Sequence, residues 1–342
     1  MAYTTIKKAS DYFNTVLFNG DSSSSQAITV GFRPDLTWQK SRNVSANHVL
    51  IDQVRGATKV ISSDTTAGED TVDTGTGITT TSTGIIVSEA SDWSSINRTG
   101  RNIVSWNWLG GNGTVSNTDG SISSTVSANT TSGFSIVSYT GNGVSATVGH
   151  GLGAIPKMII VKDRSTASTR WVVHHKDVTA GNLYLESTDA VGAGKDVGAS
   201  ATSSVFDITT WGNVNASGKN FIAYCFAEKQ GFSKFGSYTG NGNADGTFVY
   251  TGFKPAFVIV KVRDTINQWG MFDNKREGYN VANDILTANT NGIEETGSYF
   301  DILSNGFKAR STSAVTNNGG EKYIYMAFAE EPLVGDNPAT AR

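Results

Sequence analysis

The feature that most constrains the fold of this chain is a stretch of sequence that occurs three times. The clearest copy, at residues 231–263, reads GFSKFGSYTGNGNADGTFVYTGFKPAFVIVKVR. A second copy at 133–164 reads GFSIVSYTGNGVSATVGHGLGAIPKMIIVKDR, and a more divergent copy at 15–42 reads TVLFNGDSSSSQAITVGFRPDLTWQKSR. All three share an aromatic strand, a glycine turn, a Gly/Pro corner and a strand that ends in Lys-x-Arg. A repeat of this kind usually forms one supersecondary unit or small domain, so the sequence predicts three related units.

The spacing of equivalent residues sets the expected boundaries. Tyr139 and Tyr238 are 99 residues apart, as are Pro156 and Pro255, whereas Pro34 and Pro156 are 122 residues apart. A segment rich in Gly, Ser, Thr and Asn accounts for the longer first spacing. We therefore expect an N-terminal attachment arm (1–14), three β units (15–113, 133–230 and 231–331), a flexible linker between the first two units (114–132) and a C-terminal tail (332–342).

The local patterns predict strands throughout. Short runs alternate apolar and polar residues between Gly, Ser and Pro, and no window of about 12 residues has a helical period. The TGNG segments at 140–143 and 239–242 are typical of hairpin turns that need positive φ. We predict an all-β chain of tandem β-sandwich-like units, of the jelly-roll or lectin-like kind. The closing strand of each unit places three large apolar side chains on one face, predicted to lie in the core: Val104, Trp106 and Trp108, then Ile222, Tyr224 and Phe226, then Ile324, Met326 and Phe328.

The strands that follow the Gly/Pro corners have a different pattern. Residues 158–161 and 257–260 are unbroken apolar runs, which predicts strands that are covered on both faces or that lie between two units. Each strand ends in a Lys-x-Arg pair, and an acid such as Asp52 or Asp273 follows downstream. We expect the Lys or Arg at the strand end to form an ion pair with that acid.

Composition excludes several classes of protein. The net charge is -3, and only 17% of residues are charged, against about 25% in ordinary soluble proteins. Nucleic acids and anionic membranes attract clustered Lys and Arg, so we expect no binding to nucleic acid. Cys225 is the only cysteine, which excludes an intrachain disulfide and a cage of thiolates around a metal.

The opening residues MAYTTIKKAS lack the apolar core of a signal peptide, and no window approaches the roughly 18 apolar residues of a membrane span. We therefore expect synthesis in a cytoplasm and no insertion into a membrane. The high Gly, Ser, Thr and Asn content is nevertheless typical of extracellular or virion proteins. A virion protein that leaves the host cell by lysis would reconcile the two observations.

Residue patterns that carry catalysis or bind metals are weak in this chain. The nucleophile motif G-x-S-x-G is absent, and adjacent His174 and His175 would face opposite sides of a strand, which disfavours a zinc site. We expect no enzyme activity, no metal and no cofactor. A pair of carboxylates for glycoside cleavage remains open, because Glu294, Glu295 and Asp301 offer the groups and the sequence does not set their separation.

Tryptophans are the remaining candidates for a binding role. Trp93, Trp171 and Trp211 lie outside the closing strands and are the candidate platforms on which a glycan could stack. The alternative for each of them is an ordinary place in the core or at an interface, which is where most tryptophans are found.

Several long motifs resemble one known family. They are SNTDGSISSTVSANTTSGFSIVSYTGNG, ATVGHGLGAIPKMIIVKDR, the endings FIAYCFAE and YIYMAFAE, and the opening YTTIKKASDYF with QKSRN and DQVRG. Together they resemble a widespread repeat family of tailed-phage virion proteins, common in marine and cyanobacterial phages and described as structural or tail-fibre-like. The resemblance covers nearly the whole chain. It brings no catalytic residues with it.

The resemblance and the composition together predict a non-enzymatic bacteriophage virion protein, exposed on the particle and of tail-fibre or adhesin type. One alternative is a capsid decoration protein or head fibre. Another is a host-recognition protein that binds or degrades polysaccharide. The expected partners are other virion proteins attached through the N-terminal arm, further copies of the chain in a homo-oligomer, and a glycan of the host surface.

Overall fold

The same four-stranded antiparallel sheet occurs in all three units of the computed structural model, which describes residues 4–72, 77–89, 93–276 and 280–332. We call it the inner sheet. In unit 1 its order is β1 (Phe13–Asn19), β9 (Asn102–Trp108), β3 (Leu36–Ser41) and β4 (Val49–Asp52). Unit 2 repeats this order with β12 (Phe134–Thr140), β18 (Asn220–Phe226), β14 (Met158–Asp163) and β15 (Trp171–His175). Unit 3 repeats it with β19 (Ser233–Thr239), β26 (Lys322–Pro332), β21 (Phe253–Val262) and β22 (Trp269–Asp273).

A second, smaller set of strands forms the outer layer of each unit. Unit 1 has β2 (Gln26–Thr29), β8 (Gly84–Ser88) and β7 (Gly77–Thr81), with a short pair of β5 (Lys59–Val60) and β6 (Asp70–Thr71). Unit 2 has β13 (Ala146–Gly149) and β17 (Val205–Ile208), and β16 (Leu183–Tyr184) extends its inner sheet. Unit 3 has β20 (Phe248–Tyr250), β25 (Gly306–Ala309), β24 (Glu295–Leu303) and β23 (Ala282–Thr287). The prediction of an all-β, sandwich-like fold is therefore confirmed.

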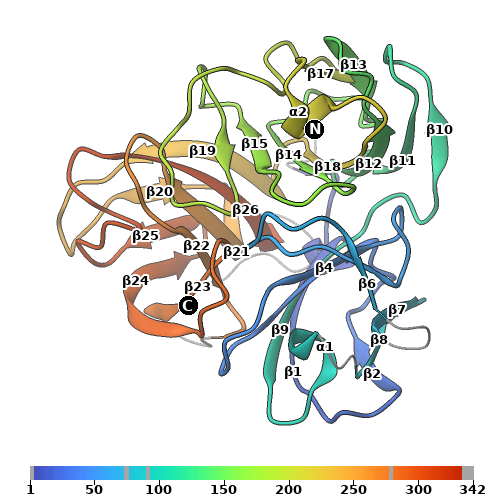
Figure 1. Cartoon of the computed structure of the whole chain (residues 1–342). Coiled ribbons are helices and arrows are strands. Elements are labelled where there is room, and N and C mark those ends of the chain that lie inside the picture. Colours follow the sequence, from blue (N-terminus) through green and yellow to red (C-terminus); the bar gives the residue numbers. More distant parts are fainter. Residues whose placement is uncertain (1–3, 73–76, 90–92, 277–279, 333–342) are drawn as a thin grey trace.

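The three units surround one shared hydrophobic core. Figure 1 shows the blue, green and orange parts of the chain as three lobes around a common centre. The apolar faces of the three closing strands β9, β18 and β26 meet there, and the ring of Phe328 lies 5.8 Å from that of Trp108 and 6.0 Å from that of Phe226. The triplets of large side chains predicted from these strands are all buried, which confirms that part of the prediction. Three units that share a core form one body.

The opposite face of each inner sheet packs within its own unit. In units 1 and 2 this produces a separate apolar cluster between the inner and outer layers. Strand β14 and residues 255–262 of β21 are buried along their whole length, because one face meets the shared core and the other meets the outer layer. The prediction that these unbroken apolar strands are covered on both faces is confirmed.

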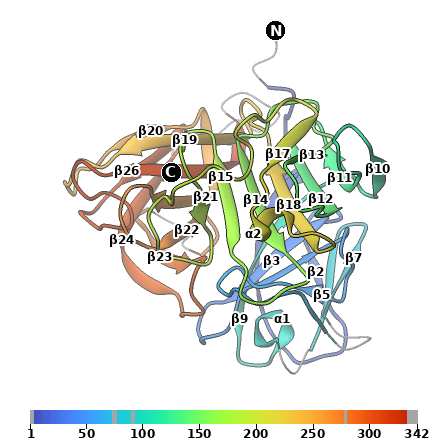
Figure 2. The same cartoon turned by 45° about the horizontal axis from the view of Figure 1, so that its top comes forward.

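The N-terminal segment is part of the body wherever the structure describes it. Thr4, Ile6 and Ala9 are buried, and Ile6 and Ala9 belong to the shared core. A short 3₁₀ turn, η1 (Ala9–Asp11), then leads into β1. Figure 2 shows the blue ribbon of the N-terminal segment entering the body from the top. The segment expected to be an N-terminal attachment arm (1–14) is therefore held against the body over residues 4–14, because Ile6 and Phe13 are buried in the shared core. Its use in attachment to other proteins stays a prediction.

The predicted linker is also folded. Within 114–132 the chain forms β10 (Val115–Asn117) and β11 (Ser124–Asn129), which add two strands to the edge of the inner sheet of unit 2. Its polar composition misled the prediction, because edge strands of this kind hold many exposed Ser, Thr and Asn side chains. The predicted tail from 332 begins where β26 ends, and residues 333–342 lie outside the described residues.

The TGNG turns connect layers. Gly143 and Gly242 have positive φ of 75° and 65°, as predicted for these glycines. The turns lead from β12 to β13 and from β19 to β20, which belong to different layers, so the hairpin prediction is wrong. Helices are short: α1 (Ser94–Asn97) and α2 (Gly212–Asn215) precede the closing strands of units 1 and 2. Within the described ranges no helix is both long and apolar enough to cross a bilayer.

Candidate functional site: the three junctions between units

Most of the buried ionisable side chains gather where one unit meets the next. In each junction, a loop or strand from the outer part of one unit lies against the third and fourth strands of the next unit's inner sheet. Residues 62–69 of unit 1 meet unit 2, residues 184–191 of unit 2 meet unit 3, and residues 287–294 of unit 3 meet unit 1. We call these junctions 1–2, 2–3 and 3–1. The three contacts close in a ring within one chain.

A ring nitrogen crosses each junction to a backbone carbonyl. Trp38 Nε1 donates to His48 Nδ1, so the proton of the His48 imidazole is on Nε2, which makes that atom the donor in its junction. The other two junctions have a tryptophan at the equivalent place. The three bonds are Trp171 to the oxygen of Ser62 (2.9 Å), Trp269 to that of Tyr184 (2.8 Å) and His48 to that of Thr287 (3.1 Å).

The strand-end lysines are buried donors of the same kind. Each amino group donates to a carbonyl of the neighbouring unit: Lys162 to Thr66 (3.1 Å), Lys261 to Thr188 (3.3 Å) and Lys40 to Asn291 (3.3 Å). Burial lowers the pKa of all three lysines to about 8. Their role is to satisfy backbone carbonyls that the junction removes from water, as buried polar groups require.

The strand-end arginines form ion pairs across two junctions. In junction 1–2, Glu69 of unit 1 accepts from Arg164 of unit 2 at 2.7 Å and lies 3.4 Å from Arg55 of its own unit. In junction 3–1, Glu294 of unit 3 accepts from Arg42 of unit 1 at 2.7 Å and from Arg276 of its own unit at 3.0 Å. In both junctions the carboxylate therefore lies between two guanidinium groups. Such bidentate, charge-assisted bonds fix the geometry of both units.

The downstream acids bind other partners than the predicted ones. Asp52 pairs with Arg55 and accepts from the hydroxyl of Tyr224 in unit 2 at 2.8 Å. Asp273 pairs with Arg276 at 2.7 Å and accepts from Nε1 of Trp106 in unit 1 at 3.1 Å. The predicted pairing with the strand-end Lys or Arg is therefore wrong. The motif Asp-x-x-Arg, present at 52–55 and 273–276, is the signal that would have found the true partner.

Junction 2–3 lacks this arrangement of charges. His175 stands at the place of the two aspartates, and it contacts the carbonyl of Tyr325 in unit 3 at 3.2 Å. Val191 donates its amide to the carbonyl of Arg263 as Glu69 and Glu294 do in the other junctions, so a valine replaces the bridging acid. Arg263 pairs instead with its neighbour Asp264 at 2.6 Å. A surface cavity of about 210 Å³ lies beside these side chains.

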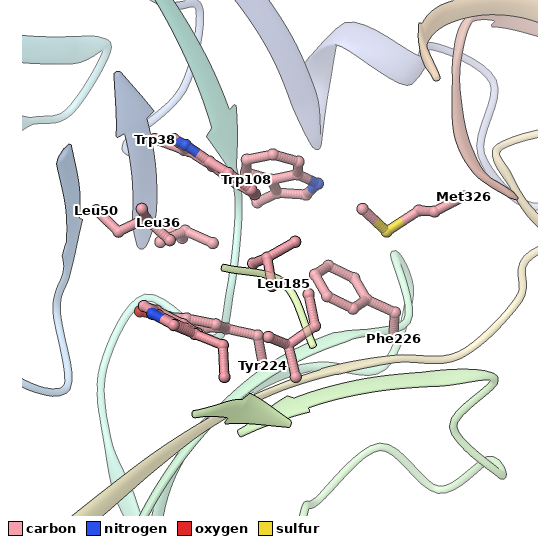
Figure 3. Close-up of a pocket in the computed structure, with 10 residues that line it drawn as sticks. Leu36, Trp38, Leu50, Trp108, Leu185, Tyr224, Phe226 and Met326 are labelled. Carbon is pink, nitrogen blue, oxygen red and sulfur yellow. The ribbon is translucent and has the colours of Figure 1, made fainter. Parts of the chain in front are cut away.

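The shared core holds only a small cavity. It has a volume of about 10 Å³ and is lined by apolar side chains from all three units. Figure 3 shows Leu185 projecting between Trp108 of unit 1 and Tyr224 and Phe226 of unit 2, with Met326 of unit 3 at one end. A space of this size is at the lower limit for one water molecule, so it is a packing gap and not a ligand site.

The three candidate tryptophans are not brought together. Trp171 is fully buried in junction 1–2, so its ring cannot stack on an external sugar, and that prediction is wrong. Trp93 and Trp211 are half-buried at equivalent places, immediately before α1 and α2. Each packs against the apolar cluster between the two layers of its own unit, and the ring centres of Trp211 and Tyr184 are 6.2 Å apart in an edge-to-face arrangement.

Side chains with catalytic potential are buried and largely satisfied. All four histidines are buried, and burial lowers the pKa of His48 and His174 to about 3 and that of His175 to about 4. His150 Nδ1 accepts from the amide of Leu152, and Nε2 donates to the carbonyl of Thr202. Burial also raises the pKa of the Cys225 thiol, which disfavours the reactive thiolate. In the part of the chain that the structure describes, no three His, Cys, Asp or Glu groups are placed to hold a metal.

The carboxylates considered for glycoside cleavage have separate surroundings. Glu294 lies in junction 3–1 between two arginines, Asp301 pairs with Arg310 at 3.2 Å, and Glu295 is exposed. The carboxylate of Glu294 is thus engaged by Arg42 and Arg276, and that of Asp301 by Arg310.

Comparison with known proteins adds one match. The profile of a family described as a domain of unknown function matches residues 8–332, which is nearly the whole chain. No curated protein and no solved structure matches the chain.

Proposed function

Because the chain belongs to the DUF7483 family, whose description carries no activity, we propose its function from its own structure and motifs: a non-enzymatic structural protein, exposed on a tailed-phage particle and of tail-fibre or adhesin type. The observation that supports this most is the use of its ionisable side chains. The three junctions use most of the buried side chains that could act as acids, bases or charge stabilisers in catalysis. These lysines, arginines, acids and histidines bind one unit to the next.

A single rigid body suits a protein that works outside the cell. Three units share one core, the ring of junctions is closed, and the only cysteine is buried and free. The chain therefore needs neither a disulfide nor a second copy to complete its own junctions. Attachment to other virion proteins then falls to the outer surface of this body, and residues 4–12 of the expected arm are held against it.

The location on the particle can be tested directly. Antibodies raised against the recombinant chain, labelled with gold, are applied to purified particles of the phage that encodes it, and the same antibodies pre-absorbed with the chain serve as the control. Labelling of the tail supports the proposal, and labelling of the head supports a decoration protein or head fibre instead. Particles without label, with the chain found only in the soluble lysate, would refute a virion role.

The absence of enzyme activity has its own test. The chain is incubated with a β-glucan, an α-mannan, a galactan or alginate, and newly formed reducing ends are measured against a heat-inactivated sample. We expect no release above that control. Release that persists in repeated preparations would contradict the non-enzymatic proposal, and Asp301 and Glu295 would then be the first acids to substitute.

A further inference from the structure

Strand β20 exposes two aromatic side chains on one face. Phe248 and Tyr250 are 45% and 55% exposed, whereas Val249 between them is buried. Alternate residues of a strand point to the same side, so both rings face solvent together. They are among the largest exposed apolar side chains of the described residues, and no structural need is evident for either.

The other two units show what the fold itself requires at these places. A glycine with positive φ follows the inward-facing residue of the equivalent strand by three positions in each unit: Gly31, Gly151 and Gly252. This aligns Val249 with Ile28 of β2 and Val148 of β13. The inward residue is buried in units 2 and 3 and half-buried in unit 1. The flanking positions are then Ala27 and Thr29 in unit 1, Thr147 and Gly149 in unit 2, and Phe248 and Tyr250 in unit 3. Ala27 and Thr29 are exposed, whereas Gly149 is buried beneath Asn117 of β10.

Two units therefore fold with small residues where unit 3 has two aromatic rings. The strand makes the same kind of antiparallel pairing in all three units. Stability of the unit does not explain the aromatic pair, since β2 of unit 1 forms with small, exposed residues at both flanking positions. A role at the surface of unit 3 explains why large apolar area is left in water.

A groove of about 310 Å³ adjoins Tyr250. It lies between β20 and the start of β19, two strands that run side by side in Figures 1 and 2, and Glu228, Gln230, Ser233 and Lys234 line it together with Tyr250. The volume falls within the usual range for small-ligand sites, roughly 300–1,000 Å³. The groove thus combines one exposed aromatic ring with a carboxylate, an amide and an ammonium group, whereas the hydroxyl of Ser233 is buried and already bonded to Lys229 and Ala227.

The charges of the groove balance each other. Lys234 Nζ lies 3.0 Å from Glu228 Oε1, and the other carboxylate oxygen accepts from the amide of Phe235 at 3.2 Å. Glu228 is 27% and Lys234 is 38% exposed, so both side chains can still reach a ligand. A balanced pair has no net attraction for an anionic ligand, whereas its donors and acceptors can bind hydroxyl groups.

From this arrangement we infer that Phe248, Tyr250 and the adjoining groove bind a neutral polysaccharide. A pyranose ring has an apolar face of C–H groups that packs on a flat aromatic ring, and its hydroxyls match the polar groups of the groove. A protein partner fits less well, because stable interfaces bury about 800 Å² on each side and β20 has only three residues to offer an added strand. The inference adds a ligand class to the proposed adhesin function. It rests on that proposal only for the biological role of binding, because the binding itself is argued from the surface of unit 3.

The test uses the purified full chain and affinity electrophoresis in gels that contain a soluble neutral polysaccharide (a β-glucan, an α-mannan or a galactan) or the acidic polysaccharide alginate. The double variant Phe248→Ala, Tyr250→Thr gives β20 the residues of β2. Ile266→Thr, which changes a 73% exposed apolar residue elsewhere in unit 3, is the matched control. Urea midpoints of both variants confirm folding, and light scattering records their oligomeric state.

We expect at least one neutral polysaccharide to retard the wild type and the control equally, at low and high salt. The double variant should bind at least about tenfold more weakly, a change of about 1.4 kcal/mol. The inference is overturned if no neutral polysaccharide retards the wild type, if only alginate does, or if the double variant binds as the wild type does. A change of oligomeric state without a change in sugar binding would assign the rings to a contact between copies, and would overturn it too. Particle labelling does not depend on any of these outcomes, so failure of the two proposals can be told apart.

Discussion

The substitution Glu294→Gln tests whether the junction ion pairs hold the units together. Glu294 is 12% exposed and lies between Arg42 of unit 1 and Arg276 of unit 3, at 2.7 and 3.0 Å. Glutamine keeps the size of the side chain and leaves the backbone bond from residue 294 to the carbonyl of Arg42 intact. The change therefore removes one negative charge from between two positive ones and alters little else.

The expected loss follows from what each arginine retains. Removing one partner of a buried ion pair costs about 3–5 kcal/mol when the other is left alone. Arg276 is 1% exposed but keeps Asp273 at 2.7 Å, and Arg42 is 20% exposed and keeps Asp284 at 3.7 Å. Both arginines are therefore partly compensated, and we expect a loss in the free energy of unfolding of about 2–3 kcal/mol.

Unfolding in urea, followed by tryptophan fluorescence, measures this loss. Trp106 and Trp269 are both buried at the junctions, so their emission reports the opening of unit contacts. The control is Glu295→Gln, an exposed neighbour on the same chain segment, which should change stability by less than about 0.5 kcal/mol. Equal effects of the two variants, or a loss below about 1 kcal/mol for Glu294→Gln, would refute the reasoning that this carboxylate links units 3 and 1.

Three further predictions use the same assay. Tyr224→Phe removes the hydroxyl that donates to Asp52 across junction 1–2. We expect the free energy of unfolding to fall by about 1.5–3 kcal/mol, the usual range for a hydrogen bond to a charged group, and an unchanged value would show that this bond does not stabilise the junction. Leu185→Ala enlarges the cavity of the shared core and should cost about 3–5 kcal/mol, because Leu185 is fully buried and already borders a gap; a loss under about 1 kcal/mol would mean that the core collapses around it. Burial lowers the pKa of His174 to about 3, so between pH 6.5 and that value the unfolded chain takes up a proton that the folded chain does not, and stability falls as pH falls. In His174→Leu the fall from pH 6.5 to 5 should be smaller by about 1.7 kcal/mol, because the unfolded histidine is half protonated at pH 6.5 and reaches the full slope of about 1.4 kcal/mol per pH unit only at lower pH. Asp64, whose pKa burial raises to about 6, opposes the trend equally in both proteins, and identical pH slopes of the two proteins would contradict the role given to His174.

The predictions that succeeded rest on local patterns. The three closing strands place large apolar side chains at every second residue, and this spacing alone predicts that Trp106, Tyr224 and Met326 each lie on the buried face of their own strand. The unbroken apolar runs likewise predict strands covered on both sides. The linker failed because composition does not separate a flexible segment from polar edge strands such as β10 and β11, whose residues 115 and 116 are largely exposed.

The predictions that failed required knowledge of the neighbouring unit. Trp171 looks like any other tryptophan in the sequence, and only docking of unit 1 against it shows that its ring is buried. The aromatic pair of β20 was also missed as a candidate site. The signal was present, since Phe248 and Tyr250 replace small residues of the other repeats, but their direction toward solvent depends on which face of the strand the core covers.

The sequence by itself determined the number of units, their β character and the side chains that share each strand face, because these follow from repeats and from a period of two residues. Only the tertiary structure decided that the units close into one body and which charges meet across the junctions. The physical reason is distance along the chain: Arg42 and Glu294 are 252 residues apart, and no local pattern records what will lie opposite a strand once three units pack around one core.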